Sequence, residues 1–400
     1  MDPDAGVEFD TLAVADYGES PAGDVTLPIH LSSTYELPGV DPDARLEDVD
    51  PDAGEFLYGR LANPTRHAVE AQLADLEGGE AGYAFASGTA AIATATLSVL
   101  DPGDHLVAFE DLYAGTRRMF EEFLQGQLGV AVEFVDATDV ATVEAAVDRD
   151  TAMVWMETPT NPLMHLCDVA AIAEVAAAHG AVFGVDNTFA SPYFQRPLAL
   201  GADIVAHSTT KYLNGHSDGI GGALVTDDPG LAEAIEFRQR VALGNGLAPF
   251  DSYLLSRGLK TLPARMRGHE ANAVQLARYL AAHDGVEAVH YPGLETHPQH
   301  ELASEQMAGY GGTLSFEIDG GIEAATAFLE AMETATLAVS LGGVESLVEH
   351  PATMTHEPLG PDRRADLGLT DSLIRLSVGL EGLGDLRTDL DRGFDAVDRL

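Results

Sequence analysis

Short apolar runs separated by helical patterns fill the middle of this chain and constrain its fold more than any other feature. Seven such runs lie between about residues 63 and 226, at positions 83–85, 105–109, 130–135, 152–156, 181–185, 204–206 and 223–225. Strands buried on both faces read as continuous apolar runs, and strands that alternate with helices form parallel sheets. Helix signals fit between them, as where Asp168 precedes an Ala/Val/Ile period that Gly180 ends. We predict an α/β fold with a mostly parallel seven-stranded sheet covered by helices.

The length of 400 residues predicts more than one folding unit, since single cores stop growing near about 250–300 residues. We expect an N-terminal arm (1–62), a large domain (63–250) and a smaller C-terminal α+β domain (251–400) with strands near 314–318 and 373–379. The acidic tract 41–55 has no apolar period and predicts a solvated loop. The uncharged segment 81–100 is long enough for a membrane span, but its small residues and Ser-Gly-Thr turn favour strand, turn and buried helix. No membrane contact is expected.

The charge balance limits the partners of the chain. Sixty-five acidic residues stand against 21 basic ones, a net charge of −44, while the hydrophobic content is an ordinary 46%. Such self-repulsion weakens at molar salt, where the screening length falls to about 3 Å. These values predict an acid-coated globular protein from a salt-rich cell and exclude nucleic acid as a partner. The single cysteine, Cys167, and an amino terminus without signal-peptide character predict a reducing, cytoplasmic location.

Lysine is scarce. The chain holds 19 arginines but only two lysines, Lys211 and Lys260. Lys211 lies in GADIVAHSTTKYLNGHSD (201–218), where an apolar run gives way to a polar, glycine-bearing loop. In a chain that otherwise replaces lysine by arginine, a lysine at a strand end indicates a chemical role. Lys260, in RGLKTLPARM, is interpreted as structural.

Besides Lys211, the chain offers the other residue types that a pyridoxal-phosphate site requires. A lysine can form a Schiff base with this cofactor. Its pyridine nitrogen needs an acid, its ring an aromatic side chain to stack on, and its phosphate a set of hydrogen-bond donors. The matching residues are Asp186 after the fifth apolar run, Ser87, Gly88 and Thr89 at a helix start, the hydroxyls of Ser208 and Thr210, and Tyr113 as the stacked ring. Each alone is a weak signal, since Asp186 suits a turn cap and Tyr113 a packing position.

Other classes fit less well. The glycines at 219–222 lack the Gly-x-Gly-x-x-Gly spacing of a nicotinamide-dependent dehydrogenase. A P-loop needs Gly-Lys, but Thr210 and Leu259 precede the lysines. The histidines show no paired ligand spacing, so no metal is predicted. A non-catalytic acidic binding protein stays open as an alternative.

Longer strings carry a family resemblance. They are YGRLANPTR (58–66), ASGTAA (86–91), DLYAGT (111–116), ETPTNP (157–162), VDNTFASPYFQRPL (185–198), HSTTKYLNGHSD (207–218), SLGGVESLVEHPATMTH (340–356) and LIRLSVGLE (373–381). In this order they resemble the Cys/Met-metabolism, or transsulfuration, family of fold-type I pyridoxal-phosphate enzymes over about residues 8–395. The resemblance implies that fold and pyridoxal 5'-phosphate as the cofactor.

The resemblance also implies residue roles. Lys211 becomes the Schiff-base lysine and the base, Asp186 the pyridine-nitrogen partner and Tyr113 the stacked ring. The rest of the implied cofactor-binding set is Ser87, Gly88, Thr89, Thr188, Ser208 and Thr210, with Tyr58 and Arg60 supplied to the neighbouring subunit of a homotetramer built as a dimer of dimers. Arg375 would clasp the substrate α-carboxylate, assisted by Asn161 and Ser340.

The implied reaction is γ-elimination or γ-replacement on a small amino-acid substrate. Arg118 resembles an arginine that cystathionine γ-synthases and γ-lyases aim at a distal carboxylate, and Gly115 stands where methionine γ-lyases carry cysteine. Val339 stands where γ-synthases and γ-lyases commonly carry glutamate, and Leu61 replaces an arginine that holds a succinyl group in some synthases. We expect a cystathionine γ-lyase or γ-synthase; the alternatives are methionine γ-lyase, cystathionine β-lyase and O-acetylhomoserine sulfhydrylase.

Overall fold

A seven-stranded sheet forms the centre of the larger unit. The computed structural model describes residues 7–15, 17–18, 22–37, 39 and 49–400. The strand order is β1-β7-β6-β5-β4-β2-β3, and all neighbours from β6 to β3 are parallel, while β7 is antiparallel to β6 and β1. The strands are β1 (Ala81–Phe85), β2 (His105–Phe109), β3 (Ala131–Val135), β4 (Thr151–Glu157), β5 (Val182–Asp186), β6 (Ile204–His207) and β7 (Gly222–Thr226). All seven predicted strands, and the mostly parallel sheet, are confirmed.

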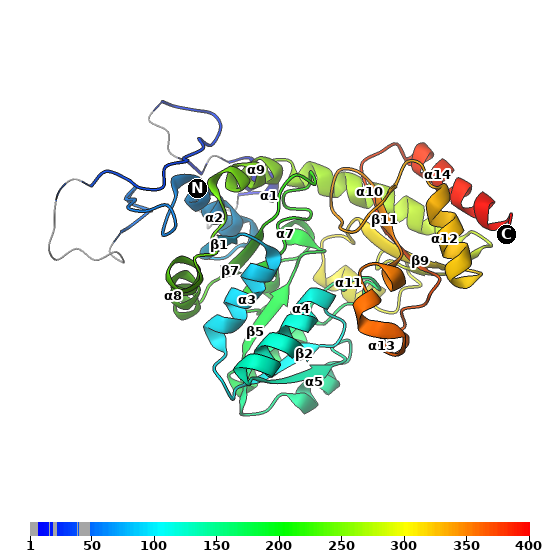
Figure 1. The fold of residues 1–400 in the computed structure, drawn as a ribbon, viewed down its shortest axis with the longest axis horizontal. Coiled ribbons are helices and arrows are strands. Elements are labelled where there is room, and N and C mark those ends of the chain that lie inside the picture. Colours follow the sequence, from blue (N-terminus) through cyan, green and yellow to red (C-terminus); the bar gives the residue numbers. More distant parts are fainter. Residues whose placement is uncertain (1–6, 16, 19–21, 38, 40–48) are drawn as a thin grey trace.

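Helices pack against this sheet, as Figure 1 shows. They are α2 (Pro64–Glu77), α3 (Gly88–Val99), α4 (Ala114–Arg118), α5 (Val140–Ala146), α6 (Val169–His179), α7 (Ser191–Phe194), α8 (Pro229–Phe237) and α9 (Pro249–Leu259), with a π-helical continuation of α4 at Met119–Leu128, another after α8 at Arg238–Leu243, and a 3-10 turn at Pro197–Leu200. Helix α2 contacts β1 and β7, α3 contacts β7 and β6, and α6 contacts β5 and β4. The predicted limits of α6 are confirmed, since the Asp168 side chain accepts from Ala171 N and Gly180 is left-handed.

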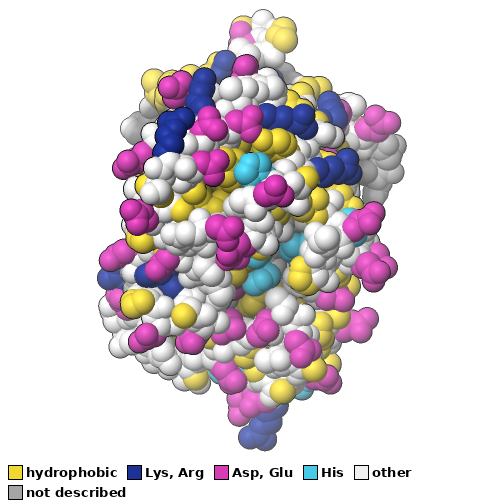
Figure 2. All heavy atoms as spheres, turned by 90° about the vertical axis from the view of Figure 1, so that its right-hand side faces the viewer, with side chains coloured by type: hydrophobic (Ala, Val, Ile, Leu, Met, Phe, Trp, Pro, Cys, Tyr) yellow, Lys and Arg dark blue, Asp and Glu magenta, His cyan; other side chains and the backbone are white. Residues whose placement is uncertain are grey.

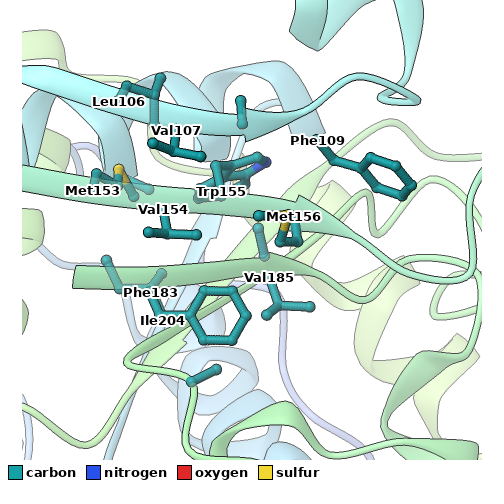
Figure 3. Packing of buried hydrophobic residues seen from close by; sticks show 14 of the residues in the cluster. Leu106, Val107, Phe109, Met153, Val154, Trp155, Met156, Phe183, Val185 and Ile204 are labelled. Atoms are coloured by element: carbon teal, nitrogen blue, oxygen red, sulfur yellow. The ribbon is translucent and has the colours of Figure 1, made fainter. Parts of the chain in front are cut away.

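The core of this unit is apolar and closely packed (Figure 3). Trp155 on β4 is fully buried and meets Phe120 edge to face at 6.4 Å between ring centroids. A Cβ on Gly184, in the neighbouring strand β5, would lie 2.5 Å from the Trp155 ring, so only glycine lets the indole lie flat against that strand. The packing fixes the strands whose carboxyl ends carry polar side chains.

A second sheet forms the smaller unit, at the right of Figure 1. Its order is β10-β11-β12-β9-β8. The strands are β8 (Val286–His290), β9 (Thr313–Ile318), β10 (Thr336–Leu337), β11 (Leu347–Glu349) and β12 (Leu373–Ser377), and the helices are α10 (Leu262–Ala281), α11 (His300–Gln306), α12 (Gly321–Ala331), α13 (Gly360–Asp366) and α14 (Leu383–Val397), with 3-10 turns at Pro351–Thr353 and Glu357–Leu359. The sequence predicted β9 and β12 only. The three missed strands are two or three residues long or, in β8, half-buried without an apolar run.

In the described part of the N-terminal segment, the helix is α1 (Phe9–Val14), which contacts α2 and α10. Val25 and Leu31 are 90% and 75% exposed. In the predicted acidic loop, residues 41–48 lie outside the described residues, whereas 50–55 form an exposed turn in which Asp50 Oδ1 accepts from Asp52 N at 2.9 Å. The domain boundaries at residues 62 and 250 stay a prediction.

The surface carries the acidic excess. Figure 2 shows Asp and Glu side chains spread over the face of the smaller unit, with fewer Arg or Lys side chains among them. No helix in the described part of the chain combines the length and apolar character needed to cross a membrane. The uncharged segment 81–100 is the strand, turn and helix predicted from its composition.

Candidate active site

A cavity of about 500 Å³ brings together most of the residues singled out from the sequence. Its lining includes Ser87, Gly88, Thr89, Tyr113, Arg118, Asn161, Asp186, Thr188, Ser208, Thr210, Lys211, Val339, Ser340 and Arg375. The cavity lies at the carboxyl ends of β4, β5 and β6, where open parallel sheets bind ligands. Loops of the smaller unit complete it with Val339, Ser340 and Thr355.

Lys211 follows β6 in a tight polar loop. Its Nζ donates to Ser340 Oγ at 2.8 Å, which joins the two units across the cavity. The pKa of Lys211 is lowered to about 8, chiefly by burial and then by the nearby Arg375, while Glu349 opposes both effects. An amine with this pKa has a substantial neutral fraction near physiological pH, as a nucleophile or a base requires.

Two buried carboxyl groups, those of Asp186 and Glu157, line the cavity at the ends of adjacent strands. Asp186 ends β5 and Glu157 ends β4, directly opposite it in the strand register. Thr188 donates to Asp186 Oδ1 from its amide at 3.0 Å and from its hydroxyl at 2.5 Å. Burial raises the pKa of Asp186, while the Thr188 hydrogen bonds and His207 oppose the rise.

Glu157 was not singled out from the sequence. Its Oε2 accepts from the Tyr113 amide at 2.8 Å, so the carboxyl holds the start of the Tyr113 loop. Burial raises the pKa of Glu157 well above its usual range, and the neighbouring Asp186 adds to the rise. An acidic residue that ends a strand beside another strand-end acid is the signal that could have found it.

The amino terminus of α3 forms a cradle. Ser87 caps the helix by accepting from Ala90 N at 3.1 Å, and the first amides of an α-helix have no acceptor within the helix. A Cβ on Gly88 would lie 2.9 Å from Ser208 Cβ, so glycine lets the helix start and the loop before Lys211 approach each other. Thr210 Oγ1 donates to Gly221 O at 3.2 Å, which closes the loop. Such a terminus suits a phosphate.

Tyr113 lies at the edge of the cavity with its side chain 46% exposed. A Cβ on Gly115 would lie 2.5 Å from the Tyr113 ring, so the glycine makes room for that ring. One cavity is therefore surrounded by the amine of Lys211, the buried acid Asp186, the ring of Tyr113 and the amino terminus of α3. This set fits pyridoxal phosphate, which needs all four.

Arg375 forms the opposite wall. It lies on β12, fully buried, and its Nη1 donates to Asn161 Oδ1 at 2.7 Å while Nη2 donates to Ser340 O at 2.6 Å. Nη1 also lies 3.0 Å from Glu349 Oε1, an acid that the sequence analysis missed. Nε is buried without a hydrogen-bond partner among the described residues. A carboxylate entering the cavity would supply the missing acceptor.

Four predicted residues lie at or beyond the rim. Arg118 lines the cavity, is exposed and pairs with Glu122 at 2.8 Å, and Val339 is 53% exposed. Tyr58 and Arg60 are not brought to the cavity by the described chain. The Tyr58 side chain is 45% exposed, and Arg60 donates to the backbone oxygen of Arg240.

The fold and the cavity define a fold-type I pyridoxal-phosphate enzyme. The sequence model of the Cys/Met metabolism PLP-dependent enzyme family matches residues 10–395. The chain belongs to this family, so it is a transsulfuration enzyme with pyridoxal 5'-phosphate as its cofactor. The non-catalytic binding protein left open by the sequence is thereby set aside.

Similar proteins carry three related names. The chain is 49% identical to a cystathionine β-lyase of Coxiella burnetii, with 92% of each chain covered. It is 46% identical to a cystathionine γ-lyase of Bacillus subtilis, covering 95% of this chain and 97% of the relative. A solved cystathionine γ-synthase of Xanthomonas oryzae pv. oryzae, in complex with cystathionine, is 42% identical with a TM-score of 0.93, covering 99% of this chain and 100% of that one.

Proposed function

We propose that this enzyme cleaves or forms the carbon–sulfur bond of a cystathionine-type substrate by γ-elimination or γ-replacement. The observation that carries the proposal is the position of Lys211, whose Nζ lies 2.8 Å from Ser340 Oγ in the same cavity as Asp186 and Arg375. Lys211 would act as a base between Asp186, which would face the cofactor ring, and Arg375, which would bind a carboxylate. This arrangement suits an α-amino acid substrate. The γ-lyase and γ-synthase names among its relatives support the same substrate class.

The cofactor would be held by residues of the larger unit. Lys211 Nζ would carry it covalently, and Asp186 would face its ring nitrogen. The amides of Gly88 and Thr89 would bind its phosphate with Ser87, Ser208 and Thr210 around it, Thr188 would hold Asp186 through its two hydrogen bonds, and Tyr113 would cover its ring. When bound, pyridoxal phosphate supplies an electron sink for a negative charge that develops at the substrate Cα.

The substrate would be held by residues from both units. Arg375 would bind the α-carboxylate through its Nε and Nη2 edge, with Asn161 and the backbone oxygen of Ser340 fixing the guanidinium plane. The neutral amine of Lys211 would then remove the Cα proton and return protons to later positions. Ser340 Oγ, the hydrogen-bond partner of Nζ, would aim that amine.

The reaction outcome depends on which carbon carries the leaving group and on whether water or a thiol reacts after that group departs. In γ-elimination, cystathionine and water give cysteine, 2-oxobutanoate and ammonia. In γ-replacement, the thiol of cysteine takes the place of the carboxylate leaving group on Cγ of an O-acylhomoserine, which gives cystathionine and the free carboxylic acid, acetate in the case of O-acetylhomoserine. Methionine γ-lyase, cystathionine β-lyase and O-acetylhomoserine sulfhydrylase activities are the alternatives.

Rim residues favour the cystathionine-type assignment. Arg118 lines the cavity edge, where it would meet a distal carboxylate, and its partner Glu122 is exposed and easily exchanged. A side chain at Gly115 would collide with the Tyr113 ring in its present position, since a Cβ there would lie 2.5 Å from that ring, so a cysteine would displace it. Val339 argues the other way, because it stands where γ-synthases and γ-lyases commonly carry glutamate and gives the rim no charge. Leu61 offers no donor to a succinyl group, which disfavours a succinylated donor.

We also propose a cytoplasmic, salt-adapted homotetramer built as a dimer of dimers, with residues 1–62 reaching the neighbouring subunit. Tyr58 and Arg60, remote from the cavity of their own chain, would then contact the phosphate of the neighbour. The exposed apolar side chains of Val25 and Leu31 would be covered in this assembly. The net charge of −44 and the lone free Cys167 support the salt-rich, reducing location.

The test incubates the holoenzyme in molar salt with cystathionine, with methionine, or with O-acetylhomoserine and cysteine. Product analysis separates cystathionine, 2-oxobutanoate and pyruvate. We expect 2-oxobutanoate from cystathionine, or cystathionine from O-acetylhomoserine and cysteine, as the fastest reaction. Dominant methanethiol release from methionine, or pyruvate from cystathionine, would replace the proposal with one of the alternatives.

A further inference from the structure

A buried acid lies directly behind the proposed carboxylate-binding arginine. Glu349 on β11 is paired with Arg375 on β12 in the antiparallel register, and both side chains are almost fully buried. Glu349 Oε1 lies 3.0 Å from Arg375 Nη1 and accepts from Thr355 Oγ1 at 2.8 Å. The acid thus occupies the edge of the guanidinium that carries Nη1.

The remaining edge of the guanidinium is the one suited to a ligand. Nη1 faces Asn161 and Glu349, and Nη2 has the backbone oxygen of Ser340. Nε lacks a hydrogen-bond partner among the described residues, and so does the second oxygen of Glu349, Oε2. Nε and Nη2 lie on the same side of the planar group, where two N–H bonds can meet one carboxylate.

The charge of Glu349 acts on the same region. Burial raises the pKa of Glu349, and the opposing influences of Arg375, Thr355 and Lys211 favour its ionised form. Burial also lowers the pKa of Arg375, an effect that Glu349 opposes. A substrate carboxylate bound to Arg375 would therefore approach a second carboxylate in a poorly solvated site, where like charges repel strongly.

We infer that Glu349 is a positioning residue that sets the affinity of Arg375 for the substrate α-carboxylate. It holds Nη1, so that Nε and Nη2 face the ligand, and its negative charge weakens carboxylate binding. Substrate and products both carry a carboxylate, so this weakening favours product release. The inference rests on the carboxylate-binding role given to Arg375 in the proposed function.

The test compares wild type with Glu349→Gln, whose amide oxygen can still accept from Nη1 but carries no charge. The holoenzyme is titrated with L-alanine, which has no leaving group, and with L-alaninamide, which lacks the carboxylate; binding is followed by the change in cofactor absorbance. We expect the variant to bind alanine about tenfold more tightly and alaninamide within about twofold of wild type.

Glu70→Gln is the matched control. Glu70 is another buried acid beside an arginine, 3.4 Å from Arg66 Nε, but it does not line the cavity. Its replacement should leave the alanine-to-alaninamide affinity ratio unchanged. If Glu349→Gln does not accumulate as folded protein, Thr355→Val offers a second route. It removes the hydroxyl that donates to Glu349 Oε1, disfavours the ionised form and should tighten alanine binding by about twofold.

A Glu349→Gln enzyme that binds alanine with unchanged or weaker affinity would overturn the inference and leave Glu349 as a packing partner of Arg375. Failure of the proposed function has a different signature. Wild-type enzyme would then fail to turn over cystathionine or O-acetylhomoserine while still binding alanine, or would bind alanine and alaninamide equally.

Discussion

The cavity has two sides that are built in opposite ways. On the cofactor side, Ser87 to Thr89 and Asp186 to Lys211 are close in sequence, and the helix terminus presents amides that have no acceptor within the helix. On the substrate side, Arg375 depends on Asn161, Ser340 and Glu349, which already engage Nη1 and Nη2, while Nε has no partner among the described residues. The first side is open and ready for a phosphate. The second must admit a carboxylate beside an existing counter-ion, so its affinity can be tuned.

The largest effect is expected on the cofactor side. Lys211→Ala removes both the covalent anchor and the base, and should lower kcat by at least about 10³-fold. Absorbance spectra of the purified variant should lose the visible band of the covalently bound cofactor, while far-UV circular dichroism stays that of the wild type. Lys260→Ala, the matched control at the other lysine, should retain both the band and the activity. A Lys211→Ala enzyme with wild-type turnover would disprove the assignment.

The substrate side should respond in activity and stability together. Arg375→Met leaves Glu349 buried without its counter-ion, which should destabilise the fold by about 3 kcal/mol and lower kcat/KM by about 10²-fold or more. The double variant Arg375→Met/Glu349→Met should recover most of the stability and none of the activity. Urea unfolding and steady-state kinetics measure the two effects. Retained catalysis in the double variant would show that Arg375 does not bind substrate.

The contrast between the cofactor side and the substrate side also explains which site residues could be predicted from the sequence and which were missed. Strands of the large sheet have continuous apolar runs, and residues such as Asp186 and Lys211 stand next to them, so local pattern places them near one sheet edge. Glu349 and Thr355 were missed because β11, on which Glu349 lies, spans only three residues, and its pairing with β12 comes from the fold. Glu157 was missed because its partner, the Tyr113 amide, is 44 residues away.

A pH experiment probes how strongly the two sides are coupled. The pKa of Lys211 is about 8, lowered first by burial and then by Arg375. Only the neutral amine attacks the cofactor, so its capture by apoenzyme should accelerate about tenfold per pH unit below 8 and level off above it. The unfolded chain keeps this proton to about pH 10.4, so apoenzyme stability should rise between pH 8 and 10.

Variants of the substrate side should move this midpoint in opposite directions. Arg375→Met removes a nearby positive charge and should shift the midpoint for cofactor capture upward, whereas Glu349→Gln removes a negative charge and should shift it downward. Stopped-flow absorbance of apoenzyme mixed with pyridoxal phosphate measures the rate. Identical midpoints in all three proteins would mean that the two sides act independently.

The smallest effect is expected at the rim, where a charge is added without touching either buried network. Val339 is 53% exposed at the cavity, next to Ser340. Val339→Glu places a solvated carboxylate at the same rim as Arg118 and should change the ratio of elimination to replacement by about threefold, since exposed charges interact by less than about 1 kcal/mol. Val339→Gln introduces a side chain as long as glutamate but without its charge, so comparing the two variants separates the effect of charge from the effect of size. Parallel assays of 2-oxobutanoate and cystathionine measure the ratio, and an unchanged ratio in the glutamate variant would mean that position 339 does not set the reaction outcome.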